Sequence, residues 1–154
     1  MTTKDDFDNF EGWVEEGLSK GRVDDVVRLT VEESDRLCES ARERFSSDQG
    51  VARWWEALRR PLVMINPADV ELTELLSEVA GRCWLIPETG RKKKPAYGLN
   101  VRDVPRALKE SPVDFNYYVV GPEMDWILML SDHDHLYVLG SLVATLSSKG
   151  DLYE

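Results

Sequence analysis

Between residues 115 and 140, short apolar runs alternate with polar clusters. Three short runs rich in aromatic and branched side chains, 115–120, 126–130 and 136–140, are separated by clusters of Gly, Pro, Asp and His. Apolar runs joined by such turn residues are typical of consecutive β-strands. In each run both alternating sets of side chains are largely apolar, which is typical of strands covered on both faces. The stretch 115–140 therefore predicts an antiparallel meander.

The first turn of this meander sets the expected surroundings of Trp126. If GPEMD at 121–125 forms a tight hairpin, Trp126 lies beside Tyr117 or Tyr118 on the neighbouring strand. Aromatic pairs across strands stabilise a sheet. We therefore expect Trp126 to be a buried structural residue.

The N-terminal segment predicts an amphipathic helix. Apolar side chains recur every three or four residues between positions 7 and 18, which indicates one apolar face on a helix over about 3–18. Thr3 and Asp6 have the spacing of a capping box at its start, and Gly21 is placed to close it. We expect this helix to pack on the core of the same chain.

A second helix is predicted by another capping box, formed by Thr30 and Glu33. This motif favours a helix over about 31–46, preceded by an extended piece at 26–31. The spacing of apolar residues equally fits one longer helix over 23–46. Both alternatives stay open at the level of the sequence.

The middle of the chain predicts two further helices. Residues 51–60 are typical of a short helix stopped by the following proline. Asn66 and Pro67 suit the N-cap and first position of another, and Gly81 suits its C-terminal end.

Two strands and a last helix are expected before the meander. The apolar run 83–87 predicts a buried strand, and 96–99 a short returning strand. Residues 100–110 predict a helix with Pro105 in its first turn or two. Together the elements predict one α+β domain over 1–154, with N-terminal helices packed on a C-terminal, mostly antiparallel sheet.

The net charge of −10 favours some partners over others. Acids outnumber bases in 1–50 and 111–154, whereas bases are in excess between them. An acidic surface repels nucleic acids and anionic membranes and attracts a basic partner, although solubility alone also explains such a charge. The candidate partner-binding acids are Glu11, Glu15, Glu16, Asp24, Asp25, Glu32 and Glu33.

The sequence SDHDH is the one cluster that suggests metal chemistry. Asp132, His133, Asp134 and His135 include both histidines of the chain. Two histidines at i and i+2 can share a metal, but a third ligand would have to come from elsewhere. The alternative is a β-turn in which Asp132 accepts backbone N–H bonds.

A basic run, Arg91, Lys92, Lys93 and Lys94, lies between a glycine and a proline. We expect a solvent-exposed loop, with phosphate binding as the alternative. No catalytic or cofactor-binding motif is present, so no catalytic residue and no cofactor is expected. Cys38 and Cys83 lack metal-binding spacing and are expected to be reduced, buried thiols of a cytoplasmic protein. No apolar stretch reaches the length of a membrane-spanning helix, and 1–10 lacks the apolar core of a secretory signal.

Residues 52–140 carry a resemblance through the segments WW-E, CWLI, FNYYVV, W-IL, DH and LYVLG. They resemble the second half of a family of small bacterial proteins of uncharacterised function, whose ends combine a Tyr-Tyr strand, Trp-Leu, an Asp-His turn and a hydrophobic-Gly strand. The helix-then-sheet layout also resembles SMI1/KNR4-type immunity proteins, which neutralise bacterial toxins. Together with the acidic charge, the small domain and the absence of catalytic motifs, the resemblance implies a non-enzymatic binding protein of immunity or inhibitor type with a basic toxin as partner, and it supplies no catalytic residues. The alternative hypothesis is a small metal-binding protein or hydrolase centred on Asp132–His135.

Overall fold

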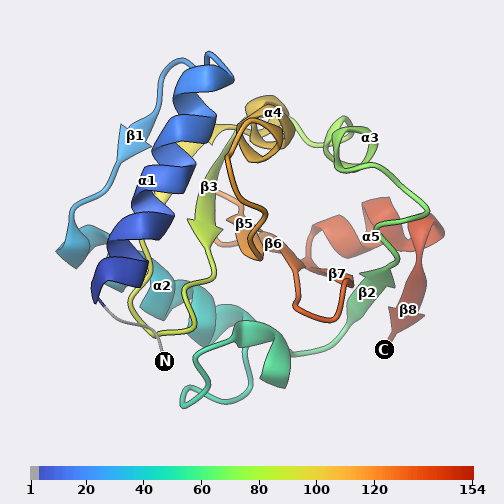
Figure 1. Cartoon of the computed structure of the whole chain (residues 1–154). Coiled ribbons are helices and arrows are strands. Elements are labelled where there is room, and N and C mark those ends of the chain that lie inside the picture. Colours follow the sequence, from blue (N-terminus) through green and yellow to red (C-terminus); the bar gives the residue numbers. More distant parts are fainter. Residues whose placement is uncertain (1–3) are drawn as a thin grey trace.

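The computed structural model describes residues 4–154, and within them a single sheet is flanked by helices (Figure 1). The strands are β1 (Val27–Arg28), β2 (Leu62–Ile65), β3 (Arg82–Pro87), β4 (Tyr97–Asn100), β5 (Tyr117–Val120), β6 (Trp126–Leu130), β7 (Leu136–Gly140) and β8 (Asp151–Tyr153). The helices are α1 (Lys4–Lys20), α2 (Val31–Phe45), α3 (Leu72–Leu76), α4 (Val104–Lys109) and α5 (Leu142–Leu146), with 3-10 turns η1 (Trp54–Ala57), η2 (Val101–Asp103) and η3 (Ser147–Lys149). The predicted α+β class is confirmed.

All strand pairs are antiparallel, and the eight described strands lie in the order β1-β4-β3-β5-β6-β7-β2-β8. The predicted meander is confirmed as β5, β6 and β7, which lie side by side near the middle of the sheet. The strands at 83–87 and 96–99 are confirmed as β3 and β4. The sheet is wider than expected because β2 and β8, which no pattern predicted, extend it beyond β7.

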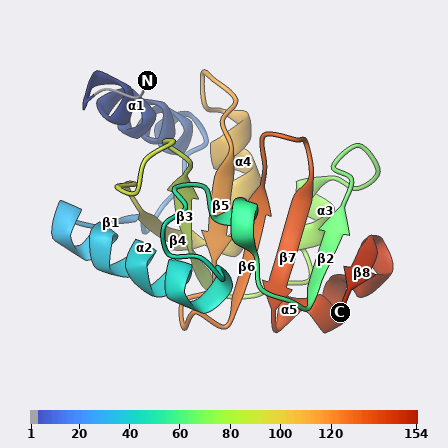
Figure 2. The ribbon, with the colours of Figure 1, turned by 90° about the horizontal axis from the view of Figure 1, so that it is seen from below.

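Each face of the sheet supports its own core. On one face, Tyr117, Val119 and Leu128 pack with apolar side chains of α1, α3, α4 and α5. On the other face, Tyr118 and Ile127 pack with residues of α2 and η1. Figure 2 is seen from the α2 side, and α2 and η1 lie in front of the strands. The apolar character of both faces of the meander thus follows from helices on both sides.

The register corrects the expected neighbours of Trp126. Tyr117 pairs with Leu130 and Tyr118 with Met129, at the far end of the hairpin from Trp126. Trp126 instead lies opposite Gly140 of β7. The turn begins after Val120, which pairs with Ile127, so Trp126 lies at the turn end of the hairpin and the two tyrosines lie further along β5.

The structure decides between the two readings of 23–46 in favour of a strand followed by a helix. Thr30 is the N-cap of α2, its hydroxyl accepts from the Glu33 amide, and the Glu33 carboxylate accepts from the Thr30 amide. The extended Thr30 backbone separates β1 from the helix, and the Thr30 hydroxyl and Glu33 carboxylate satisfy two N–H groups at the start of the helix. For the first helix, α1 ends near Gly21 as expected, and the predicted N-cap Thr3 lies outside the described residues.

Two predicted helices are shorter than expected. The stretch 51–60 contains only the 3-10 turn η1. The helix expected to begin at Asn66 begins instead after Glu71, because the Asn66 side chain accepts from the Ala68 amide within a separate turn. Gly81, with φ of 94°, lies well beyond the end of α3 and leads into β3.

The helix expected at 100–110 is confirmed as η2 followed by α4, with Pro105 near the start of α4. Among the described residues, no helix combines the length and the apolar character that crossing a bilayer requires.

Candidate functional site

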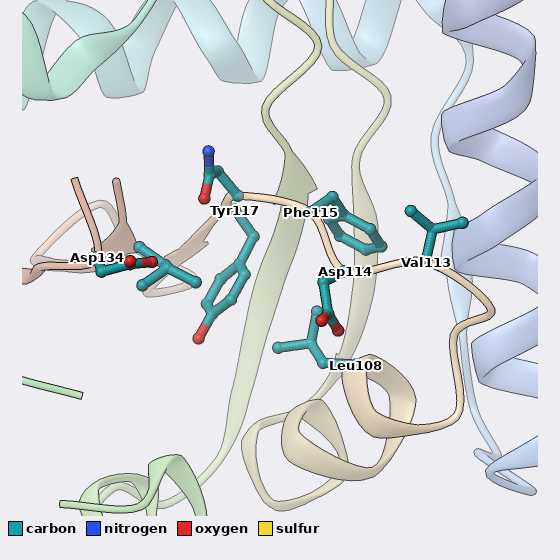
Figure 3. A pocket seen from close by; sticks show the side chains of 8 residues that line it. Leu108, Val113, Asp114, Phe115, Tyr117 and Asp134 are labelled. Carbon is teal, nitrogen blue, oxygen red and sulfur yellow. The ribbon is translucent and has the colours of Figure 1, made fainter. Parts of the chain in front are cut away.

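A cavity of about 320 Å³ opens where the segment before β5 passes between α4 and the β6–β7 turn. Its lining comprises Leu108, Val113, Asp114, Phe115, Asn116, Tyr117, Leu130 and Asp134. We call it the Tyr117 pocket. Figure 3 shows the Tyr117 ring between Asp134 on one side and Asp114 with Leu108 on the other.

The pocket is built by strand alternation and by local hydrogen bonds. Phe115 and Tyr117 are two residues apart and belong to the same face, and the Phe115 ring packs edge-on against Phe10 of α1 at 6.2 Å between centroids. The Ser111 hydroxyl donates to the Trp13 carbonyl at 3.1 Å, which ties the segment before β5 to α1. These contacts hold one wall of the pocket against the helical layer.

The opposite wall is the β6–β7 turn. The Ser131 amide donates to the His135 carbonyl at 2.9 Å, and the Asp134 amide donates to the Ser131 carbonyl at 3.2 Å. Asp134 has a φ of 56°, a left-handed conformation that aspartate tolerates better than most residues. The turn thereby places Asp134 at the rim of the pocket (Figure 3).

The Tyr117 hydroxyl is a polar group in the lining of the pocket. Tyr117 is only 6% exposed, and burial raises the pKa of its phenol. Among the described residues, the hydroxyl has no hydrogen-bond partner. The hydroxyl oxygen is not fully enclosed and reaches solvent at the pocket, so a ligand there can exchange a hydrogen bond with it.

Two carboxylates give the pocket a negative rim. Asp114 and Asp134 are both exposed, and neither forms an ion pair with any residue that the structure describes. Leu108, Phe115 and Leu130 supply apolar and aromatic surface beneath them. This arrangement suits a cation on an apolar stem, such as an arginine or lysine side chain.

The SDHDH turn does not assemble a metal centre. Among the described residues, no group of three or more His, Cys, Asp or Glu side chains is placed to hold a metal ion. His133 is 72% exposed at its side chain, with its Nε2 3.5 Å from Asp132 Oδ1. The expected β-turn is present, but the Ser131 hydroxyl, and not Asp132, accepts from the His133 amide at 3.3 Å.

The predicted acidic partner surface is divided among several places. Glu15 forms a double hydrogen bond with Arg28, at 2.6 and 2.7 Å, and Glu16 pairs with Lys20 at 3.1 Å. The Glu33 carboxylate belongs to the capping box, and hydrogen bonds from the Thr30 amide and then from the Thr30 side chain lower its pKa. These three acids therefore already form hydrogen bonds or ion pairs with other residues of the chain.

The remaining four predicted acids do not form one patch. Glu11 borders a small cavity at the start of α2, and Glu32 is exposed in the first turn of that helix. Asp24 and Asp25 lie in the loop after α1, beside arginines that line another cavity. Asp24 and Asp25 thus line a different cavity from the one that Glu11 borders at the start of α2.

The basic run is exposed at Arg91, Lys92 and Lys93, but the expectation is wrong for Lys94. The Lys94 side chain is fully buried, and its Nζ lies 2.8 Å from Glu88 Oε1 and donates to the Arg91 carbonyl. Burial lowers the pKa of Lys94, although the adjacent Glu88 carboxylate opposes that shift. A phosphate site that uses all four bases is excluded by this geometry.

Glu88 links Lys94 to the core beneath α2. The Tyr118 hydroxyl donates to Glu88 Oε1 at 2.5 Å and accepts from the Trp54 amide at 3.1 Å. The Trp54 ring stacks on Tyr118 with 4.0 Å between centroids. The side chains of Lys94, Glu88 and Tyr118 all have partners within this group, so the cluster is a structural one. The indole Nε1 of Trp54 is also buried, but it has no hydrogen-bond partner among the described residues.

Sequence reasoning missed most of the Tyr117 pocket. Alternation along 115–120 already puts Phe115 and Tyr117 on one face, and Asp134 was singled out for metal binding. Asp114, which precedes the strand, carried no motif. The convergence with Leu108 and Leu130 depends on strand register, which the sequence pattern does not define.

No protein-family model matches the chain, and no curated protein or solved structure is significantly similar to it.

Proposed function

We propose that the protein is a non-enzymatic binding protein whose partner is a basic polypeptide, as in an immunity or inhibitor protein that neutralises a basic toxin. The observation that carries the proposal is the Tyr117 pocket, where two unpaired carboxylates form the rim and the Tyr117 hydroxyl has no partner among the described residues. A basic side chain from the partner would enter the pocket.

The charge of the chain supports this direction. A net charge of −10 accelerates encounter with a basic partner, and the rim carboxylates then contribute to orientation. The exposed Asp24, Asp25 and Glu32 add long-range attraction without belonging to the pocket. The reduced thiols Cys38 and Cys83, buried in different cores, suit action in the cytoplasm.

The test uses a short blocked peptide with one arginine between leucines, and the same peptide with the neutral isostere citrulline. We expect the arginine peptide to shift the backbone NMR signals of residues 113–117 and 130–134, and the citrulline peptide to leave them unchanged. Asp114→Asn with Asp134→Asn should weaken arginine binding about fivefold or more, since two charge contacts are lost. Tyr117→Phe should weaken it by a smaller factor, because one hydrogen bond is removed.

The matched control is Asp69→Asn with Asp151→Asn, which makes the same change in net charge at two exposed aspartates away from the pocket. If this control weakens binding as much as the pocket variant, the attraction is general and the pocket is not the site. A basic protein captured from the source cell should be retained by the control and lost by Asp114→Asn/Asp134→Asn. Signals that move only outside 113–117 and 130–134 would contradict the proposal.

A further inference from the structure

A second cavity, of about 420 Å³, gathers four arginines from separate parts of the chain. Arg22 follows α1, Arg82 begins β3, Arg102 lies in η2 and Arg106 in α4. We call it the arginine cavity. It shares no lining residue with the Tyr117 pocket.

The arginine cavity has a fixed frame. Arg82 and Asn100 are directly paired across β3 and β4, and the Asn100 side chain accepts from the Arg102 amide at 3.2 Å. Arg82 Nη2 donates to the Asp25 carbonyl at 2.6 Å and so holds the loop after α1 against the sheet. A Cβ at Gly21 would lie 3.3 Å from Arg106 Cγ, which shows how closely this loop approaches α4.

The backbone of the loop is unusual at two positions that line the cavity. Arg22 has a φ of 54° and Asp25 a φ of 57°. For residues other than glycine this left-handed conformation is uncommon, and it occurs preferentially at binding and catalytic sites. Both residues contribute directly to the cavity.

The positive charge of the cavity is only partly compensated. Arg106 pairs with Asp103 at 2.9 Å. Within residues 4–154, the side chains of Arg22 and Arg102 have no hydrogen-bond or ion-pair partner, and Arg82 is bound only to a neutral carbonyl. Asp24 and Asp25 line the same cavity but lie beyond ion-pair distance of its guanidinium groups.

We propose that the arginine cavity binds a small molecule that carries a phosphate group. Guanidinium groups bind oxyanions through paired, charge-assisted hydrogen bonds. The unpartnered guanidinium groups of Arg22 and Arg102 provide such donors, and so does that of Arg82, which is bound only to a carbonyl. The volume falls in the range of small-molecule sites. The lining contains no aromatic ring on which a nucleobase could stack, which favours a compact polar ligand.

The test is a titration of the intact protein with inorganic phosphate and pyrophosphate at low ionic strength, followed by calorimetry and backbone NMR. We expect shifts at residues 22–25, 82 and 100–106, and weaker binding as salt is added. Arg22→Gln with Arg102→Gln should raise the phosphate dissociation constant about tenfold or more. Asp24→Asn should lower it, because a repelling carboxylate is removed.

Two matched controls make the result specific. Arg36→Gln with Arg44→Gln changes the net charge equally on exposed positions of α2, and should bind phosphate as the parent does. Arg91→Gln with Lys92→Gln tests the exposed basic loop. Loss of binding in either control to the same degree as in Arg22→Gln/Arg102→Gln, or no phosphate binding by the parent, would overturn the proposal.

Citrate forms a further arm, because carboxylates can use the same guanidinium forks. Phosphate or pyrophosphate binding that exceeds citrate binding supports the phosphate assignment, whereas citrate binding alone overturns it. The outcome is independent of the arginine-peptide experiment, since the two sites have no residue in common.

Discussion

Lys94 shows how the surroundings of one residue can outweigh its local sequence. Four consecutive bases indicate an exposed loop, and three of them are exposed. The fourth is drawn inward by Glu88, and their side chains are 0% and 2% exposed at a separation of 2.8 Å. A buried charge is tolerated only with a partner, and Glu88 is six residues away in a segment with no recognisable motif.

We expect Lys94→Met to lower the free energy of unfolding by about 3–5 kcal/mol, since it leaves the Glu88 carboxylate buried without its cation. Chemical denaturation measures the change. Lys93→Met is the matched control, because the side chain of Lys93, next to Lys94 in the sequence, is exposed. This variant should unfold like the parent. Adding Glu88→Gln to Lys94→Met should recover part of the loss, and equal stability of Lys94→Met and the parent would refute the role of the pair.

At the scale of elements, local signals predicted what local interactions decide. The Thr30–Glu33 capping box specified the start of α2 because both of its hydrogen bonds lie within four residues. The turn residues and double apolar alternation of 115–140 specified β5, β6 and β7 for a similar reason. The residues that determine where these elements begin and end lie within the elements or directly beside them.

Elements that depend on distant partners could not be predicted in the same way. The run Leu62–Ile65 becomes β2 by pairing with β7 and β8, both more than seventy positions further along the chain. Asn66 accepts from a backbone amide two residues later, which resembles an N-cap in sequence but closes a turn here. The Tyr117 pocket has the same character, because register brings Leu130 beside Tyr117 while α4 supplies Leu108.

The central hairpin provides a prediction that separates structure from function. Trp126 is 5% exposed, and a Cβ on Gly121 would lie 2.6 Å from its indole Nε1, so the ring fills a closely packed site. Trp126→Ala should cost about 3–5 kcal/mol of unfolding free energy. His133→Ala, in an exposed turn, should cost less than about 1.5 kcal/mol. Thermal melting compares the two variants, and a parental melting temperature for Trp126→Ala would contradict the packing described.

The whole molecule is one sheet between two apolar layers. Adjacent residues such as Val119 and Val120 belong to different cores. Disruption of the strands would therefore expose the apolar side chains of both cores at once. The helices of the two layers are joined through short loops and through the strands themselves. We therefore expect the two cores to unfold together.

The two cysteines report on this directly, because Cys38 lies in the α2 core and Cys83 in the core of the opposite face. Burial raises the pKa of each thiol to about 12, so neither reacts with a thiol reagent near neutral pH until the surrounding core opens. In single-thiol variants, Cys83→Ala and Cys38→Ala, labelling is measured across a series of denaturant concentrations. After correction for each variant's own stability, both thiols should give an opening free energy equal to that of global unfolding. If Cys38 reacts at lower denaturant than global unfolding while Cys83 stays protected, the α2 layer opens by itself and the shared sheet does not couple the two cores.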